Sequence, residues 1–330
     1  MSLELISVIV CTYNRAEMLR ATLRDVTRQQ ADERFSFEIV VVDDRSTDHT
    51  RSVVAQAAST SSVPVRYVQG EGTGPTGALN AGLADSQGQW IAFFDDDQLA
   101  GPRWLQELYY TAMESGAHLV GGPIRLSFPQ PETAKLGPVC RALYGEHPNF
   151  KDAQRRNHIP LPGGGNRLIN RTVFNSIGVF DNAIANGGAD TDIVVRARAA
   201  GFRFAWAPNA IVRHLIPPDR VSSARIKRYC LQAGCSISYI DWKNRGMVTM
   251  ILLCAARIGR AFLVKLPLLL ASHLRGNPFE ILDVKATLWT AAGYARGSLY
   301  HLAPRLFPQA TFFALNRFRN PTQNVMESPN

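Results

Sequence analysis

The chain has 330 residues, of which 46% are hydrophobic and 19% charged, so it can fold around a substantial core and is not disordered. Its net charge of +9 suits an anionic partner such as a membrane surface, and the absence of a nucleic-acid-binding motif argues against nucleic acid. Five cysteines without CxxC spacing argue against a zinc site or a disulfide framework. The chain starts without the pattern of a signal peptide, which favours the cytoplasm.

Buried strands and helices alternate along the first part of the chain. The expected strands span residues 5–11, 38–42, 65–68 and 90–95. The expected helices span residues 18–26, 46–58 and 78–86. Because parallel strands are joined by helical crossovers, this alternation predicts an α/β protein with a mostly parallel, doubly wound sheet.

Polar side chains follow these strands at the points where they end. They are Thr12, Asn14, Asp43, Asp44 and the triplet Asp95–Asp97. Open α/β sheets bind ligands outside the carboxyl ends of their strands, so we expect these side chains to converge on one nucleotide-binding edge. Asp44 is suited to accept a hydrogen bond from a uracil-type ring N–H.

The three adjacent acids of Asp95–Asp97 repel one another and need a cationic partner. Carboxylate oxygens suit Mg²⁺ or Mn²⁺, and such ions commonly carry substrate phosphates. The chain has neither a G-x-G-x-x-G fingerprint nor a Walker-type loop, so a metal would have to replace a glycine-rich phosphate cradle. A solvated acidic loop is the simpler alternative for the triplet taken alone.

The second half continues with a helix to residue 115, a strand over 118–125 and a Pro-rich stretch over 127–160. That stretch is either a lid over the donor or a disordered insertion. A glycine turn at Gly163–Gly165 leads into a strand and a helix, and a later helix opens with Asp190 and Asp192. Two short strands are then expected over 202–206 and 210–214, of which the second ends at His214.

The residues from 218 to 330 are basic and helical in pattern. We expect the basic side chains Arg220, Arg225, Lys227 and Arg228 on one helical segment. The apolar stretch that begins at Met247 is interrupted by Arg257, Arg260 and Lys265, so no charge-free run reaches the ~18 residues of a transmembrane helix. An amphipathic helix lying in a membrane interface fits better, and a buried appendage or an oligomer contact is the alternative.

Three stretches of the chain resemble the inverting family 2 glycosyltransferases, which have the GT-A fold. They are Ser7–Arg15, Val41–Asp48 and Phe93–Asp97, and the resemblance extends over about residues 5–215. It implies a GT-A type, doubly wound, mostly parallel sheet with a helical C-terminal appendage. Residues 1–217 would form the transferase domain, with a donor half to residue 126 and an acceptor half from 127, and residues 218–330 would form the appendage.

The resemblance implies an enzyme of the hexosyltransferase type. It would move a sugar from a nucleotide-diphosphate sugar, with UDP favoured, to a hydroxyl of a glycan or lipid-linked saccharide, using Mn²⁺ or Mg²⁺. Such chemistry serves cell-surface or extracellular polysaccharide and glycolipid synthesis, here at the inner face of the cell membrane. A nucleotidyltransferase is an alternative, although the loop Thr12–Arg15 lacks the glycines that it needs.

The same resemblance implies roles for individual residues. Asp190 takes the position of the general base, and Asp97, Asp95 and His214 are the expected metal ligands. The expected nucleotide-sugar contacts are Thr12, Tyr13, Asn14, Arg15, Asp43, Asp44, Asn80, Asp95, Asp96, Gly164 and Gly165.

The chain departs from the family pattern at two places. The family's Arg or Lys is missing near Ala78–Asn80, and Ala189 stands where Glu is usual. The first departure leaves one diphosphate contact without a residue, and the second affects the handling of the acceptor. Both motivate the alternative of a catalytically impaired scaffold at a membrane surface.

Overall fold

The computed structural model describes residues 3–129, 135–146, 164–184 and 187–307. The chain forms two compact units, Met1–Ser222 and Ser223–Asn330. We call them the sheet unit and the helical unit and describe each by itself.

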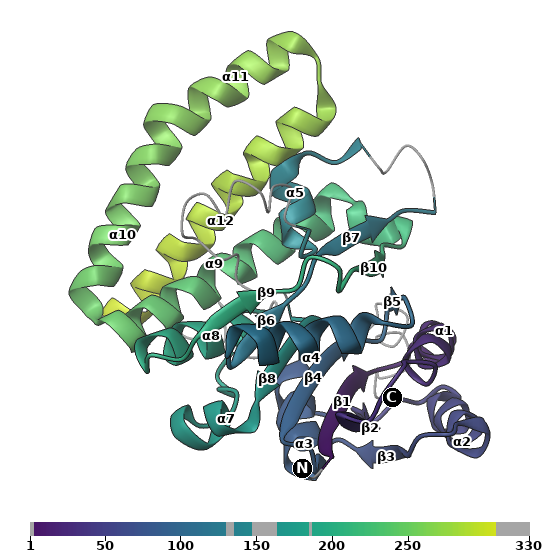
Figure 1. The fold of residues 1–330 in the computed structure, drawn as a ribbon. Helices are drawn as coiled ribbons and strands as arrows, with labels where there is room; N and C mark the ends of the chain where they lie inside the picture. The colour runs from purple at the N-terminus through teal and green to yellow at the C-terminus, as the bar shows by residue number, and fades with distance from the viewer. Residues whose placement is uncertain (1–2, 130–134, 147–163, 185–186, 308–330) are drawn as a thin grey trace, which may run out of the picture. The chain divides into compact units, whose positions relative to one another are not determined.

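The sheet unit contains a seven-stranded sheet in the order β3-β2-β1-β4-β8-β6-β9 (Figure 1). Its strands are β1 (Glu4–Thr12), β2 (Phe35–Asp43), β3 (Val65–Gln69), β4 (Trp90–Asp95), β6 (Leu119–Gly121), β8 (Asn166–Asn170) and β9 (Phe204–Trp206). The pairs among β3, β2, β1 and β4 are parallel, and β8 runs antiparallel to both of its neighbours. This confirms the predicted α/β architecture with a mostly parallel sheet.

A second sheet of three strands lies in the same unit. Its strands are β5 (Gln98–Ala100), β10 (Val212–Leu215) and β7 (Ile124–Ser127). β10 pairs antiparallel with β5, so that His214 lies opposite Gln98. This pairing brings the end of β10 close to the chain that follows β4.

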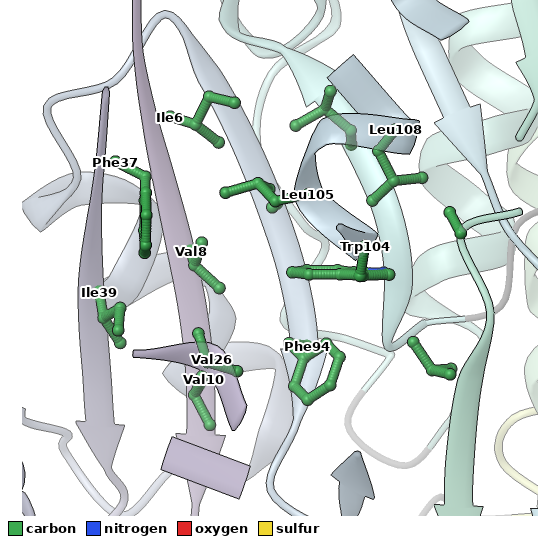
Figure 2. Close-up of a cluster of buried hydrophobic side chains, with 14 of the residues drawn as sticks. Ile6, Val8, Val10, Val26, Phe37, Ile39, Phe94, Trp104, Leu105 and Leu108 are labelled. Carbon is green, nitrogen blue, oxygen red and sulfur yellow. The ribbon is translucent and has the colours of Figure 1, made fainter. Parts of the chain in front are cut away.

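Helices cover both faces of the large sheet, because the central strands are apolar along most of their length and successive side chains point to opposite faces. On one face, Val8 of β1 belongs to a buried cluster with residues of α1, α2 and α4, including Leu19 and Trp104 (Figure 2). On the other face, Ile9 packs against Gly82 of α3, where a Cβ would lie 2.6 Å from the Ile9 side chain. The helices of this unit are α1 (Ala16–Val26), α2 (Thr50–Thr60), α3 (Pro75–Asp85), α4 (Trp104–Ser115), α5 (Pro138–Leu143), α7 (Arg171–Ile177) and α8 (Ala189–Ala199).

Two predicted elements of the sheet unit differ from the structure. The second helix begins at Thr50 rather than near Ser46, because the Asp48 carboxylate accepts the Thr50 N–H at 3.0 Å before the helix starts. The single strand predicted over residues 118–125 is two strands in different sheets, since the chain turns at Gly122. A Cβ at Gly122 would meet the Ala210 carbonyl, so the close approach requires glycine. Of the stretch 127–160, the structure describes α5 and its flanks, and residues 130–134 and 147–163 lie outside the described residues, as does the tail from 308.

The helical unit confirms the predicted C-terminal appendage. Its elements are α9 (Ser223–Arg245), α10 (Met247–Arg260), a π-helical segment (Ala261–Lys265), α11 (Leu266–Arg275) and α12 (Pro278–Leu302). α9 and α12 pack closely, because Gly234 and Gly293 have no side chains that would hold the two backbones apart (Figure 1). The π-helical segment precedes Pro267, which lacks the N–H that a regular helix would require there.

Candidate active site

The acidic triplet lies where β4 ends and the chain turns into β5. Asp95 is exposed, whereas Asp96 and Asp97 are buried. The register of the parallel strands places Cys11 beside Asp95 and Thr12 beside Asp43. The Thr12 hydroxyl donates to Asp96 Oδ2 at 2.8 Å, so the first strand holds the triplet directly.

Two arginines supply positive charge to the buried acids. Arg15 Nη1 lies 2.8 Å from Asp96 Oδ1 and 3.0 Å from Asp97 Oδ2. Arg220 Nη1 lies 2.9 Å from the same Asp97 oxygen. Burial disfavours the charge of Arg15, but Asp96 and Asp97 more than offset this and raise its pKa. Charge-assisted contacts of this length are among the stronger polar interactions in proteins.

His214 completes the surroundings of Asp97. Its Nδ1 lies 3.0 Å from the Tyr144 carbonyl oxygen, and its Nε2 lies 3.2 Å from Asp97 Oδ1. Burial works against the charge of His214, yet the contact with Asp97 raises its pKa. Burial also works against the Asp97 carboxylate, but His214, Arg220 and Arg15 together hold its pKa well below the usual range.

A glycine turn brings the triplet together with the helix that carries Asp190. A Cβ on Gly165 would overlap the Asp95 carboxylate, and a Cβ on Gly164 would lie 3.7 Å from Asp190 Oδ2. Although Asp95 is an exposed residue, protein atoms surround its carboxylate closely, and this desolvation together with the neighbouring Asp97 raises its pKa to about 6. One carboxylate from β4 and one from α8 therefore flank the same two glycines.

Asp190 is the second residue of α8, where the N-terminal backbone amides favour a carboxylate. Its Oδ1 accepts the Thr191 N–H at 2.9 Å. Asp192, by contrast, is buried and pairs with Arg196 at 2.8 Å, so it stabilises the helix. This supports the prediction that Asp190, rather than Asp192, is the candidate for chemistry.

Arg167 is a fully buried arginine of β8. Its guanidinium group lies over the Phe93 and Phe180 rings at 4.8 and 5.4 Å. Its Nε and Nη1 have no hydrogen-bond partner within the described part of the chain. Burial lowers its pKa, and the charges of Asp190 and Asp95 oppose that shift. Arg167 thus places one positive charge near both carboxylates that flank the glycine turn.

The predicted nucleotide contacts lie at the neighbouring strand ends. Several of them already form hydrogen bonds with backbone groups of the protein. The Asp44 carboxylate accepts the N–H groups of Gly72 and Gly74 at 2.8 and 2.9 Å. Asn14, at a φ of 52°, accepts the Thr47 N–H at 2.7 Å. The Asn80 amide pairs with both backbone groups of Phe180.

Two other predicted nucleotide contacts lie nearby. Asp43 accepts the Tyr67 hydroxyl and the Ser46 N–H, each at 2.8 Å. Tyr13 is half-buried in the loop after β1. A role in nucleotide binding stays a prediction for these residues.

The model of glycosyl transferase family 2 matches residues 7–178, which is more than half of the chain. The chain belongs to this family. It is 27% identical to Glycosyltransferase AglE of Haloferax volcanii over 217 residues, covering 66% of this chain and 69% of that one. It is 28% identical to the succinoglycan biosynthesis protein ExoM of Rhizobium meliloti over 233 residues, covering 69% and 72%.

A solved structure shares the fold of this family member. It is the mannosyltransferase PcManGT from Pyrobaculum calidifontis in complex with GDP-Man and Mn²⁺, with a TM-score of 0.61 and 19% identity over 90% of this chain and 88% of that one. The likeness confirms the GT-A type fold. The family assignment confirms that the protein is a glycosyltransferase enzyme.

The residues beside Asp97 fit a divalent metal of the kind that family 2 glycosyltransferases use. A carbonyl oxygen can only accept, so His214 Nδ1 donates to Tyr144 and a neutral ring leaves a lone pair on Nε2. Asp97 Oδ1, which faces Nε2 at 3.2 Å, is buried and has no other hydrogen-bond partner in the described residues. Two acceptors that face each other require a proton or a cation between them, and oxygen with imidazole suits Mn²⁺.

The ligand set is not complete from the protein alone. Across the described ranges, no cluster of three or more His, Cys, Asp or Glu is arranged to hold a metal. Donor phosphates and water would therefore supply the remaining ligands, as is common for Mg²⁺. Asp95 as a third protein ligand stays a prediction.

Besides Arg167, sequence reasoning missed two residues of this site, Arg220 and Tyr144. Arg220 was expected on a helix with Arg225, Lys227 and Arg228, and this was wrong. It belongs to a short 3-10 turn, Pro218–Val221, and its carbonyl oxygen accepts the Tyr144 hydroxyl at 2.6 Å. Tyr144 therefore contacts both residues: its carbonyl oxygen faces His214 Nδ1, and its hydroxyl donates to the Arg220 carbonyl oxygen. The pair Pro217-Pro218 was the available signal, because prolines interrupt both strands and helices.

Proposed function

We propose that the protein is an inverting, metal-dependent glycosyltransferase that uses a nucleotide-diphosphate sugar, with UDP favoured as the nucleotide. The observation that carries the proposal is the meeting of Asp95 and Asp190 at the Gly164–Gly165 turn. In-line displacement at an anomeric carbon needs a base on one side and a stabilised leaving group on the other. Asp95 of β4 and Asp190 of α8 lie beside the same glycine turn, so one can serve the leaving-group side and the other the acceptor side.

On the leaving-group side, the proposed partners of the donor are the groups around Asp97. When bound, Mn²⁺ or Mg²⁺ would act as a Lewis acid for the leaving diphosphate, held by Asp97 and His214 with Asp95 beside them. Arg15 and Arg220 are well placed to turn toward phosphate oxygens, since guanidinium groups pair with phosphates in two-pronged contacts. They supply the cationic contact that the missing Arg or Lys near residues 78–80 leaves open.

On the acceptor side, Asp190 takes the proton of the attacking hydroxyl. Glycine at both 164 and 165 leaves the space between Asp190 and Asp95 free of side chains at that turn. Ala189 is buried, so the position where the family has Glu packs against protein here. Arg167 places a positive charge near both carboxylates, and this charge offsets the repulsion between them.

The donor's nucleoside would lie along the ends of β1 and β2. Asp44 is the proposed acceptor for the ring N–H of the base, because each of its two oxygens receives one backbone amide and retains capacity for a further hydrogen bond. Thr12, Tyr13, Asn14, Asp43, Asn80 and Asp96 complete the proposed contacts. These residues come from successive strand ends and from the helix after β3.

The proposed acceptor is a saccharide or a lipid-linked saccharide, in polysaccharide or glycolipid synthesis at the cytoplasmic face of the cell membrane. The names of the relatives support this class. One of them, the GalNAc(5)-diNAcBac-PP-undecaprenol beta-1,3-glucosyltransferase of Campylobacter jejuni, is 35% identical over 118 residues, which is 35% of this chain and 37% of that one.

The proposal is tested with the purified protein, a panel of nucleotide sugars and Mn²⁺. Asp190→Asn and Asp97→Asn should each lower donor turnover by about 100-fold or more, while the variant Glu114→Gln, at an exposed position of α4, keeps it. The anomeric configuration of the product, measured by nuclear magnetic resonance, should be inverted. Full turnover in both site variants would refute the assignment, and a lack of metal-dependent donor binding in calorimetry would favour the scaffold alternative.

A further inference from the structure

The helical unit carries one long stretch of exposed apolar residues, Met247–Arg275. In the part of the chain that the structure describes, it is the stretch whose length and composition would allow it to cross a membrane. Only 6% of its most apolar segment is buried. Six of its apolar side chains are 64–90% exposed, namely Val248, Leu252, Phe262, Leu263, Leu270 and Leu274. A helix on the surface of a water-soluble protein has the opposite pattern, with polar residues outside.

The two faces of this stretch differ sharply. Met250 is fully buried, and Arg257 lies over the Tyr294 ring of α12 at 4.5 Å, so these residues define the inner face. Val248 and Leu252 are four residues apart, as are Leu270 and Leu274, so the members of each pair share a face of the helix. We call the six exposed apolar residues the outer face. Phe262 and Leu263, in the π-helical segment between the two pairs, are exposed as well.

The net positive charge of the chain lies in the same unit. Residues 223–330 hold 14 Lys and Arg against 4 Asp and Glu, whereas residues 1–222 hold 22 against 23. The stretch Met247–Arg275 itself contains four Lys and Arg and no Asp or Glu. An apolar face inside a strongly basic unit is complementary to the surface of an anionic bilayer, which offers acyl chains beneath negative headgroups.

The positions of the basic residues decide how the stretch meets the bilayer. A transmembrane helix needs about 18 to 20 residues, and every segment of that length within Met247–Arg275 contains Arg260 and at least one further Lys or Arg. Crossing the bilayer would place two or more cations in or near hydrocarbon, which is costly. A helix that lies in the plane of the interface lets Arg260 and Lys265 extend along its side to the headgroups.

We propose that Met247–Arg275 docks in the plane of an anionic bilayer, with the outer face among the acyl chains and the basic residues at the headgroups. To the membrane location proposed above, this docking adds the surface that contacts the bilayer and the orientation of the helix in it. It does not depend on sugar transfer, because lipid binding is measured without a sugar donor.

The experiment is sedimentation of the full chain with vesicles. Vesicles that contain phosphatidylglycerol should carry the protein down, phosphatidylcholine vesicles should bind it much more weakly, and high salt should reduce the binding. A sodium carbonate wash should release the bound protein, as expected for a helix that lies in the interface. Resistance to the wash would overturn the in-plane mode.

Variants separate the apolar contribution from the charge. Leu263→Gln/Leu270→Gln keeps good helix formers and should lower the partition coefficient by about 100-fold. Arg260→Gln/Lys265→Gln should lower it by about 25-fold on anionic vesicles, at about fivefold per charge. The control, Met113→Gln/Val179→Gln, removes exposed apolar side chains of the sheet unit and should leave binding unchanged.

Two further results would overturn the proposal. One is equal binding of the wild type and the outer-face variant to anionic vesicles. The other is a stable dimer in light scattering that the outer-face variant converts to a monomer while neither protein binds vesicles. In that case a second copy of the chain covers the outer face. Normal donor turnover in a variant that has lost lipid binding would show that the two proposals stand separately.

Discussion

Asp97 is the residue on which most of the site's charges converge. Its carboxylate contacts Arg15, Arg220 and His214, and these contacts hold its pKa low although burial works against the charge. A buried carboxylate is tolerated only when such partners are present. The arrangement therefore keeps an anionic ligand available at the sheet edge, and it presents arginines that can exchange a protein carboxylate for a phosphate.

Arg220→Gln should weaken binding of a nucleoside diphosphate by about 10- to 100-fold, because one charge-assisted contact to the diphosphate is lost. Binding of the nucleoside without phosphates should not change. Tyr144→Phe removes the hydroxyl that holds the Arg220 carbonyl and should cause a smaller loss, about 2- to 10-fold. Calorimetry measures both, with Arg213→Gln on exposed β10 surface as the control. An unchanged affinity in Arg220→Gln would contradict the assigned role.

Gly165→Ala should lower kcat/KM by about 100-fold or more, because its Cβ would displace the Asp95 carboxylate from the site. Gly101→Ala is the matched control, since a Cβ there meets nothing within 4 Å. Thermal unfolding of the purified variants shows whether the loss is confined to the site. Wild-type turnover in Gly165→Ala would mean that Asp95 and the glycine turn are not engaged together.

At the scale of elements, the sequence predicted the central strands well, because parallel strands buried on both faces are continuous apolar runs such as that of β1. It failed where long-range contacts decide the conformation. The turn at Gly122 depends on Ala210, and the start of α2 depends on Asp48, whose carboxylate accepts the distant Ala16 N–H as well as the neighbouring Thr50 N–H. Arg220 could not be assigned to the site because its partner Asp97 is distant in sequence.

Within the site, the strand-end acids were accessible to sequence reasoning and their cationic partners were not. Parallel strands bring their ends to one edge, so the convergence of Thr12 with Asp96 follows from topology. The meeting of Asp190 with Asp95 rested on resemblance alone, because no local pattern places α8 beside the Gly164–Gly165 turn. Arg167 gave no signal, since an arginine in a strand is usually exposed.

The link between β2 and β3 predicts a response to alkaline pH. Tyr67 of β3 donates to Asp43 of β2, and burial together with this carboxylate raises the pKa of Tyr67 to about 12, above about 10 in an unfolded chain. A raised folded pKa contributes stability that is present below pH ~10 and lost as the pH rises through ~12. Tyr67→Phe should therefore lose stability less steeply than the wild type over that range. Denaturant unfolding at several pH values measures this, and parallel curves for the two proteins would contradict it.

At the scale of the whole molecule, the charges around the triplet predict that folding is independent of metal. Arg15 and Arg220 already offset the negative charges of Asp96 and Asp97, so a chelator should shift the melting temperature by no more than about 2 °C. The same chelator should abolish sugar transfer, because the proposed reaction needs the metal. Thermal unfolding with and without Mn²⁺ checks this. A large destabilisation on chelation would show that the metal is a structural requirement.

The exposed outer face of Met247–Arg275 has a kinetic consequence for an enzyme that acts on a lipid-linked acceptor. The proposed docking on the bilayer would confine enzyme and acceptor to the same thin layer, so their effective concentration would rise without any new contact in the site. Encounter would then become a search in two dimensions rather than three. The apparent KM for such an acceptor would be set largely by its density in the membrane, and specificity would depend in part on where the protein is held.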